Sequence, residues 1–368
     1  MNVSPAQVSW FRLRRSGLVE PFATAEAAAR GLVGIQAQLF PAAALSLWNR
    51  TTHLTFDAVR SGVFDERSLI KLWGQRQTLH LFQRDDWPVI YAAFKERETW
   101  WERKYAQKGG NPAAFDQTVR AVADQMRDGR MLGHADVAEL ELALDEWLYA
   151  SWGGLFMSLV RRGLVCHGPP DGGAARFVHR EAWVPDLSWQ PPTTEAANLA
   201  LTRRYLAAYG PATVQDVGYW LGASVKNARR WVQTLADEIA EVEVAGTVRM
   251  ALLEDLPALT ETPPARRAWP IRLLYRFDPL LLALKDKTWV VPAEHYKRIW
   301  RPAGHVEGVL WIRDQAKGTW RYDRTAKGLK ITLSPFGPLS KTVRKALEKQ
   351  ALGIAQFFNT SLLAVKEA

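Results

Sequence analysis

The order of apolar and polar residues along the chain predicts three consecutive segments built in the same way. In each segment, helices with apolar positions at helical spacing precede short runs in which apolar and polar residues alternate. Helices followed by a two-stranded hairpin are typical of winged helix-turn-helix units. The pattern therefore predicts three such units, over residues 1–95, 96–190 and 191–262.

The first segment has clear helix starts. Thr24 is a predicted N-cap, and Pro41 suits the first turn of the next helix. Residues 36–40 (QAQLF) would then connect the two helices. The remaining elements predicted here are a helix from residue 65 (DERSLIKLWG) and a strand at 78–82.

The second and third segments repeat this order. The predicted helices lie at residues 114–126, 135–143, 148–163, 195–210, 212–222 and 224–237. The predicted hairpin strands lie at 164–168 with 176–178, and at 238–246 with 247–253. The third segment is the clearest helix-turn-helix, because Thr213 resembles a cap and residues 222–224 form a tight turn.

The C-terminal part has a different pattern. Residues 254–268 are rich in proline and polar residues, which is typical of a linker. Short alternating segments follow, and a helix is predicted at 340–359. The alternating segments are 271–277, 280–286, 288–292, 308–314, 318–323 and 329–336. Their spacing predicts an antiparallel β-barrel in the fourth region, 263–368, and an α+β fold for the chain.

Composition and charge extend this picture. With 368 residues, 48% hydrophobic and 23% charged, the chain is long and apolar enough for several folded cores. The net charge is +10, but residues 265–349 hold 19 Lys or Arg against 7 Asp or Glu, and the rest holds 29 against 31. A basic region favours a polyanion partner. On charge alone, a solvated basic surface is an equal alternative.

Aromatic residues are interleaved with these cations. Tryptophans at 300, 311 and 320 stand next to arginines, including Arg313 and Arg321. Such pairs favour stacking on nucleic acid, and core positions in the barrel are the alternative. Both arginines are candidate DNA contacts.

Several classes of protein are excluded. The single cysteine, Cys166, cannot form an internal disulfide and is a predicted core residue. No run approaches the ~18 apolar residues of a membrane helix, and no secretory signal is visible, so we expect a cytoplasmic protein. The seven histidines lack ligand spacing, and phosphate-loop, dinucleotide and nucleophile-elbow motifs are missing. We therefore expect no metal and no cofactor.

Gln36 and Gln38 are the strongest chemical candidates. They lie in otherwise apolar sequence, and residues two apart in an extended connector face the same side. Solvated surface glutamines are the alternative. Each amide offers a carbonyl acceptor and N–H donors without titrating near neutral pH. Together they are suited to orienting a water molecule.

These residues also match a known family. Residues 34–38 (GIQAQ), 48–50 (WNR) and 73–81 (WGQRQTLHL) resemble the AlkZ/YcaQ-like crosslink-repair DNA glycosylases of the azinomycin-resistance type. Residues 276–281 (RFDPLL) and 318–321 (GTWR) agree as well. The resemblance covers nearly the whole chain and implies three tandem winged helices and a C-terminal β-barrel. Two positions differ within the family: Gln77 stands where a glycine is common, and Gln38 where the YcaQ branch has Asp.

The resemblance implies a monofunctional DNA glycosylase with Gln36 and Gln38 as catalytic residues. Alkylation at N7 makes a purine cationic and a good leaving group, so positioning a water and stabilising the sugar cation suffice. The expected partner is duplex DNA with alkylated or crosslinked purines, bound by a monomer associated with the nucleoid. A non-catalytic winged-helix transcriptional regulator is the alternative.

DNA contacts are expected from nine further residues. For His80 a satisfied strand histidine, for Arg76 a surface cation, and for residues 49–50 a helix cap are the alternatives. The expected contacts are Asn49, Arg50, Arg76, His80, Lys226, Arg229, Arg230, Arg313 and Arg321.

Overall fold

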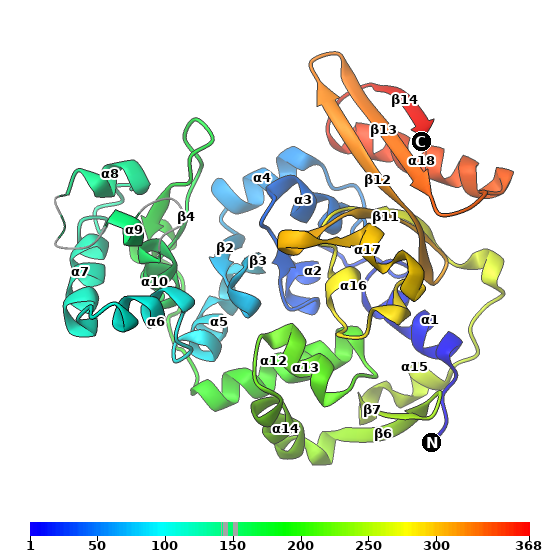
Figure 1. Ribbon diagram of the computed structural model, residues 1–368, viewed down its shortest axis with the longest axis horizontal. Helices are drawn as coiled ribbons and strands as arrows, with labels where there is room; N and C mark the ends of the chain where they lie inside the picture. The colour runs from blue at the N-terminus through cyan, green and yellow to red at the C-terminus, as the bar shows by residue number, and fades with distance from the viewer. Residues whose placement is uncertain (141, 143–145, 150–153) are drawn as a thin grey trace. The chain divides into compact units, whose positions relative to one another are not determined.

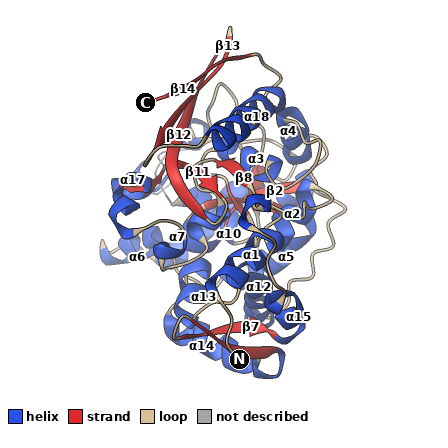
Figure 2. Ribbon diagram, turned by 90° about the vertical axis from the view of Figure 1, so that its right-hand side faces the viewer, coloured by secondary structure: helices blue, strands red, loops and turns tan. Residues whose placement is uncertain are grey.

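The computed structural model describes residues 1–140, 142, 146–149 and 154–368 (Figure 1). Helices and strands both contribute to the fold, so the predicted mixture of α and β structure is confirmed (Figure 2). The chain divides into two compact units. We call Met1–Val59 with Leu199–Ala368 the discontinuous unit and Arg60–Asn198 the central unit. The predicted division into four regions stays a prediction.

The discontinuous unit combines helices with one five-stranded sheet and two two-stranded sheets. Its helices are α1 (Pro5–Arg15), α2 (Ala25–Gly31), α3 (Phe40–Trp48), α12 (Thr194–Tyr209, begun in the central unit), α13 (Val214–Leu221), α14 (Val225–Thr234), α15 (Leu256–Thr260), α16 (Pro279–Leu282), α17 (Tyr296–Ile299) and α18 (Lys341–Phe357). Its strands are β1 (Ile35–Gln36), β6 (Ile239–Val244), β7 (Thr247–Leu252), β8 (Ile271–Leu274), β9 (Trp300–Arg301), β10 (His305–Val306), β11 (Gly308–Ile312), β12 (Gln315–Thr325), β13 (Gly328–Pro335) and β14 (Leu362–Glu367). Its 3₁₀ turns are Ala236–Glu238, Leu253–Asp255, Arg266–Ala268, Lys287–Trp289, Ala293–His295 and Pro302–Gly304.

The central unit is mostly helical, with two antiparallel pairs. Its helices are α5 (Trp87–Phe94), α6 (Trp100–Gln107), α7 (Pro112–Asp124), α8 (His134–Ala138), α9 (Glu146–Tyr149), α10 (Leu155–Arg161) and α11 (Arg180–Trp183), while α4 (Phe56–Phe64) crosses the boundary between the units. Its strands are β2 (Leu69–Trp73), β3 (Leu79–Gln83), β4 (Val165–His167) and β5 (Phe177–His179), with 3₁₀ turns at Gln75–Gln77 and Arg84–Asp86. Strand β2 pairs with β3, and β4 with β5. Part of the helix predicted at 148–163 lies outside the described residues.

Local capping explains the third predicted helix-turn-helix. The Thr213 hydroxyl accepts a hydrogen bond from the Asp216 N–H, and the Asp216 carboxylate accepts one from the Thr213 N–H, which starts α13. Gly222 ends α13 with φ +63°, the left-handed conformation that glycine adopts without a steric penalty. Ser224 then caps α14. These helices and the β6–β7 hairpin are confirmed as predicted.

Three predicted elements are wrong. Residues 65–74 do not begin a helix, because Leu69, Ile70 and Leu72 are all buried and belong to strand β2. Short apolar runs do not distinguish a strand from a buried helix. Residues 280–286 and 288–292 are not strands. Asp278 caps α16 ahead of Pro279, and the Asp286 carboxylate caps the following 3₁₀ turn.

The C-terminal sheet has five strands in the order β14-β13-β12-β11-β8. In this order, β8, β11, β12 and β13 are antiparallel neighbours, but β14, which the sequence did not predict, runs parallel to β13. A parallel neighbour requires a crossover, and α18 provides it (Figures 1 and 2). In the described residues β8 and β14 are the sheet edges, so the predicted antiparallel barrel is not confirmed.

Aromatic packing joins this sheet region to α3. The Trp48 ring lies 5.9 Å from Phe357 of α18, and a Cβ added at Gly353 would stand 2.8 Å from Trp48. Helix α18 therefore approaches α3 closely enough to require glycine at this point. Because α3 follows residues 36–39 directly, this contact helps to fix the segment that contains the two glutamines.

Candidate functional site

The two glutamines lie in a short turn between α2 and α3. Gln36 ends strand β1 and is 7% exposed, Ala37 is fully buried, and Gln38 is exposed where the chain bends. Gly34 precedes them with φ +88°, which turns the chain out of α2. The segment therefore holds the Gln36 amide inside the protein and the Gln38 amide at its surface.

Arg50, a predicted phosphate contact, has a different environment. Its Nη1 and Nη2 donate to the two carboxylate oxygens of Asp278, both at 2.7 Å, and Nη1 also donates to the Ser46 carbonyl. Both charged side chains are fully buried. The prediction that Arg50 contacts DNA is wrong for this structure, because a buried, doubly bonded guanidinium is not available to a phosphate.

Asn49 is likewise structural. Its Nδ2 donates to the carbonyls of Leu45 and Leu273, at 3.2 and 3.1 Å, and the side chain is buried. The predicted DNA contact is therefore replaced by a bond between α3 and strand β8. The alternative of a helix cap is closer, since Asn49 is the C-cap residue of α3.

In the central unit, His80 is fully buried in strand β3, which favours the alternative of a satisfied strand histidine over the expected DNA contact. Its Nδ1–H donates to the Thr78 carbonyl at 2.9 Å, and its Nε2 faces Arg76 Nη2 at 3.5 Å. Burial, together with the Arg76 charge, lowers the pKa of His80 to about 3. The neutral imidazole accepts from Arg76 and helps to orient it.

Arg76 is partly exposed and occupies an unusual backbone region. Both Arg76 and Gln77 have φ +56°, the left-handed conformation. Gln77 stands where a glycine is common among the proteins that this chain resembles, and the loop keeps that conformation without one. Arg76 is therefore presented from a strained turn between β2 and β3.

The three candidate cations of α14 share one helix face. Lys226, Arg229 and Arg230 are exposed on α14, at positions i, i+3 and i+4. Ala228 and Trp231 bury the opposite face. This is the arrangement expected of a helix that approaches a phosphate backbone, and the DNA contact stays a prediction.

The predicted aromatic and basic pairs of the C-terminal sheet separate into two groups. Trp311 and Trp320 are core residues, and the Trp320 Nε1–H donates to the Leu274 carbonyl at 2.8 Å. Arg313, in the turn after β11, and Arg321, on β12, are both exposed. Trp311 and Trp320 are therefore not stacking faces, whereas the arginines remain accessible.

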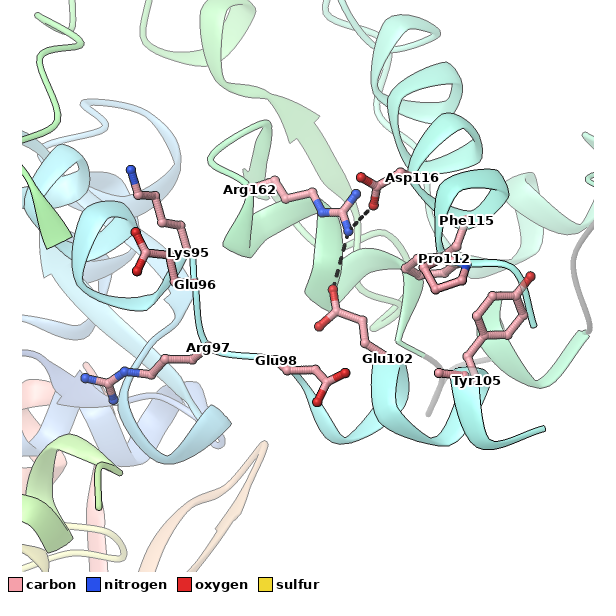
Figure 3. Close-up of a pocket in the computed structure, with 11 residues that line it drawn as sticks. Lys95, Glu96, Arg97, Glu98, Glu102, Tyr105, Pro112, Phe115, Asp116 and Arg162 are labelled. Carbon is pink, nitrogen blue, oxygen red and sulfur yellow. Dashed lines mark hydrogen bonds and ion pairs between the residues drawn. The ribbon is translucent and has the colours of Figure 1, made fainter. Parts of the chain in front are cut away.

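A pocket of about 280 Å³ lies in the central unit between α6, α7 and Arg162 (Figure 3). Arg162 lies 2.6 Å from an Asp116 oxygen and 3.4 Å from a Glu102 oxygen. The charged residues that line the pocket have both signs: Lys95, Glu96, Arg97, Glu98, Glu102, Asp116 and Arg162. Paired charges of both signs give no preference for phosphate.

Comparison with known proteins identifies the family. A family profile described as "DNA glycosylase AlkZ-like" matches residues 29–357. The chain is 30% identical, over the full length of both proteins, to an interstrand DNA cross-link repair glycosylase of Streptomyces sahachiroi. It is also similar to the solved structure of Streptomyces sahachiroi DNA glycosylase AlkZ, with a TM-score of 0.85, 28% identity and full coverage of both chains. The chain belongs to the AlkZ-like DNA glycosylase family.

Membership of the AlkZ-like family confirms the predicted resemblance and the predicted enzyme class. It favours catalysis over the alternative of a non-catalytic regulator. The roles of Gln36 and Gln38 stay predictions, as do those of the exposed cations.

Other features of this AlkZ-like chain bear on cofactors and location. Among the described residues, no group of three or more His, Cys, Asp or Glu side chains is arranged to hold a metal ion. Cys166 is buried, as predicted, and burial raises the pKa of its thiol. The helices within the described ranges are all too short or too polar to cross a membrane.

Sequence reasoning missed the structural partner of Arg50. Asp278 belongs to the RFDPLL segment that matched the AlkZ-like family, but its role was not assigned. One signal was available: an arginine that follows the apolar helix FPAAALSLW is placed for burial, and a buried arginine needs a carboxylate.

Proposed function

We propose that this protein is a monofunctional DNA glycosylase that hydrolyses the N-glycosidic bond of N7-alkylated purines in duplex DNA, including interstrand crosslinks. The observation that supports it most strongly is the pair Gln36 and Gln38, a buried amide followed by an exposed one, in an AlkZ-like chain. The relative named as an interstrand cross-link repair glycosylase supports the substrate class.

The two amides suit a leaving group that is already activated. A purine alkylated at N7 carries a positive charge, so its bond to C1′ breaks without a strong general acid. Water attacks C1′, the base leaves with the bonding electrons, and the water proton passes to solvent. The glutamine carbonyls orient the water and place negative dipole near the developing sugar cation. Without an assigned Schiff-base lysine at the glutamines, the product is an abasic site in an intact strand.

We also propose the finer architecture implied by the family. The repeated helices with hairpins β2–β3, β4–β5 and β6–β7 are consistent with three winged helix-turn-helix units. The C-terminal sheet then corresponds to the family's β-barrel region. The protein acts as a monomer on chromosomal DNA in the cytoplasm, close to the nucleoid.

The experiment uses two duplexes, one with N7-methylguanine and one with an N7 crosslink. Each is incubated with the protein and divided, with and without alkali. We expect alkali-dependent strand cleavage from the parent protein, no cleavage before alkali, and strong loss in Gln36→Ala and Gln38→Ala. Gln125→Ala, at the exposed C-cap of α7, is the matched control and should keep full activity. No alkali-labile product, or equal product from the double glutamine variant, would refute the proposal.

A further inference from the structure

Helix α6 in the central unit has two chemically different faces. Glu102 and Tyr105 point into the pocket of Figure 3. Trp100, Lys104 and Lys108 follow one another at one-turn intervals on another face. No residue of α6 is buried, and Trp100, at 47%, is the only exposed tryptophan in the described part of the chain.

Three indole rings hold the ammonium group of Lys104. Its Nζ lies 4.5 Å from the ring centre of Trp100, 5.2 Å from that of Trp147 and 5.9 Å from that of Trp101. The rings also contact one another, with centres 4.5 Å apart for Trp100 and Trp101. Lys108 Nζ lies 4.6 Å from the Trp147 ring. Cation–π attraction therefore restricts both lysines before any ligand binds.

The carboxylates closest in sequence are paired with arginines. Glu98 lies 4.0 Å from Arg103, and Glu102 lies 3.4 Å from Arg162. In the part of the chain that the structure describes, no ion pair holds Lys104 or Lys108, so their positive charge is available to an external anion. Gly109, which follows Lys108, borders open space among the described residues, because a Cβ added there would meet no atom within 4 Å.

A hydrogen bond connects this face to the strained loop that contains Arg76. The Trp100 N–H donates to Oε1 of Gln77 at 3.4 Å, and Gln77 directly follows Arg76. The start of α6 therefore lies beside the loop of a predicted DNA contact. Arg76, Lys104 and Lys108 belong to neighbouring parts of one unit, so a single anionic chain is the partner that fits them.

We infer that Lys104 and Lys108 bind phosphates of one DNA strand, and that the three indoles hold Lys104 ready for this contact. The spacing of about 5–6 Å between side chains one helical turn apart suits neighbouring phosphates. A lysine already restricted by aromatic rings loses less side-chain entropy on binding than a free one. The inference rests on the proposed function only in taking DNA as the partner.

Equilibrium binding to an undamaged duplex tests the inference. Fluorescence anisotropy would give the binding constant between about 50 and 200 mM salt for the parent, Lys104→Gln, Lys108→Gln and the double variant. Each single variant should lose one phosphate contact, which makes the negative slope of log K against log salt shallower by about 1. The double variant should make it shallower by about 2. Unchanged slopes in the double variant would overturn the inference.

Two further variants separate charge from preorganisation. Trp100→Leu keeps both lysines, so the slope should stay while affinity falls several-fold at every salt concentration; unchanged affinity would overturn the role of the indoles. Arg127→Gln is the matched control in the same unit, because Arg127 is exposed but already paired with Asp124 and Glu181, at 2.7 and 3.1 Å. Arg127→Gln should change neither the affinity nor the salt slope. Since the duplex is undamaged, these slopes are independent of excision, and failure of the glycosylase proposal would appear only in the alkali assay.

Discussion

Arg50 and Asp278 form a fully buried, two-bond ion pair across 228 residues of sequence. Arg50 follows α3, the helix that begins two residues after Gln38. Asp278 follows strand β8 and caps α16 through the Leu280 N–H. The pair therefore joins two of the segments that match the family and fixes the helix next to the glutamines to the C-terminal sheet.

Removing one charge of this pair should destabilise the protein strongly. Asp278→Asn keeps the size of the side chain but leaves the Arg50 guanidinium buried without its counter-charge, which typically costs about 3–5 kcal/mol. Urea unfolding followed by circular dichroism measures the loss. Arg50→Lys should also destabilise, because an ammonium cannot form the two parallel bonds that the guanidinium makes.

The control for this prediction is another arginine–carboxylate pair with two hydrogen bonds, which lies at the surface. Arg203 Nε and Nη2 donate to the two oxygens of Glu238, at 2.6 and 2.7 Å, and the two side chains are 42% and 46% exposed. Water screens this pair, so Arg203→Gln should cost far less than Asp278→Asn. Equal losses from the two variants would contradict a special role for the buried pair.

The left-handed backbone at Gln77 predicts that glycine at this position gives a more stable protein than alanine. Gln77→Ala and Gln77→Gly both lose the amide contact with Trp100, but only glycine adopts φ +56° without crowding its Cβ. We expect the glycine variant to exceed the alanine variant in unfolding free energy by about 1 kcal/mol.

Gln75, two residues before Gln77, tests the sign of this difference between glycine and alanine. Gln75 is buried and lies outside the set of residues with positive φ. There, Gln75→Gly should be less stable than Gln75→Ala, because glycine gains only chain entropy in the unfolded state. Thermal unfolding of the four variants provides the comparison, and the same sign at both positions would refute the argument.

Local features were predictable from the sequence because their causes lie within a few residues. Thr24 and Thr213 cap helices where expected, and Gly222 ends α13, since each needs only a neighbouring N–H or a permissive backbone. The glutamine segment was recognisable for a similar reason: two amides in an apolar stretch stand out without any tertiary information.

Distant pairings were not predictable in the same way. Nothing near Arg50 indicates that its partner is Asp278, so the arginine was expected to contact DNA or to cap the helix. Strand β14 was missed because its pairing depends on the crossover by α18. Residues 280–286 have the apolar pattern of a strand, but a helix cap at Asp278 determines their structure. In each case a contact distant in sequence, or a cap outside the pattern, overrides local preference.

Stability should fall in mild acid through His80. Its pKa is lowered from 6.5 to about 3 in the folded protein, so between these values the unfolded chain binds a proton that the folded one does not. Above pH 6.5 both states are neutral at His80, and this destabilising effect is absent. As the pH falls below 6.5, the free energy of unfolding decreases by about 1.4 kcal/mol per pH unit. His80→Gln should reduce the pH slope of unfolding free energy by this amount between pH 6 and pH 4, since glutamine does not titrate. Identical slopes for parent and variant, measured by urea unfolding, would exclude His80 as a cause.

Excision by two amides should be insensitive to pH. Neither Gln36 nor Gln38 titrates, and the charge of an N7-alkylated purine does not depend on a proton, so the single-turnover rate on N7-methylguanine should be flat from about pH 5.5 to 8.5. Gln38→Asp introduces a carboxylate at the exposed position, where its reference pKa is about 4. Any activity of that variant should decline as the carboxylate becomes protonated below about pH 5, while the parent rate stays level. A bell-shaped profile in the parent protein would indicate a titrating acid or base and would contradict water positioning by glutamines alone.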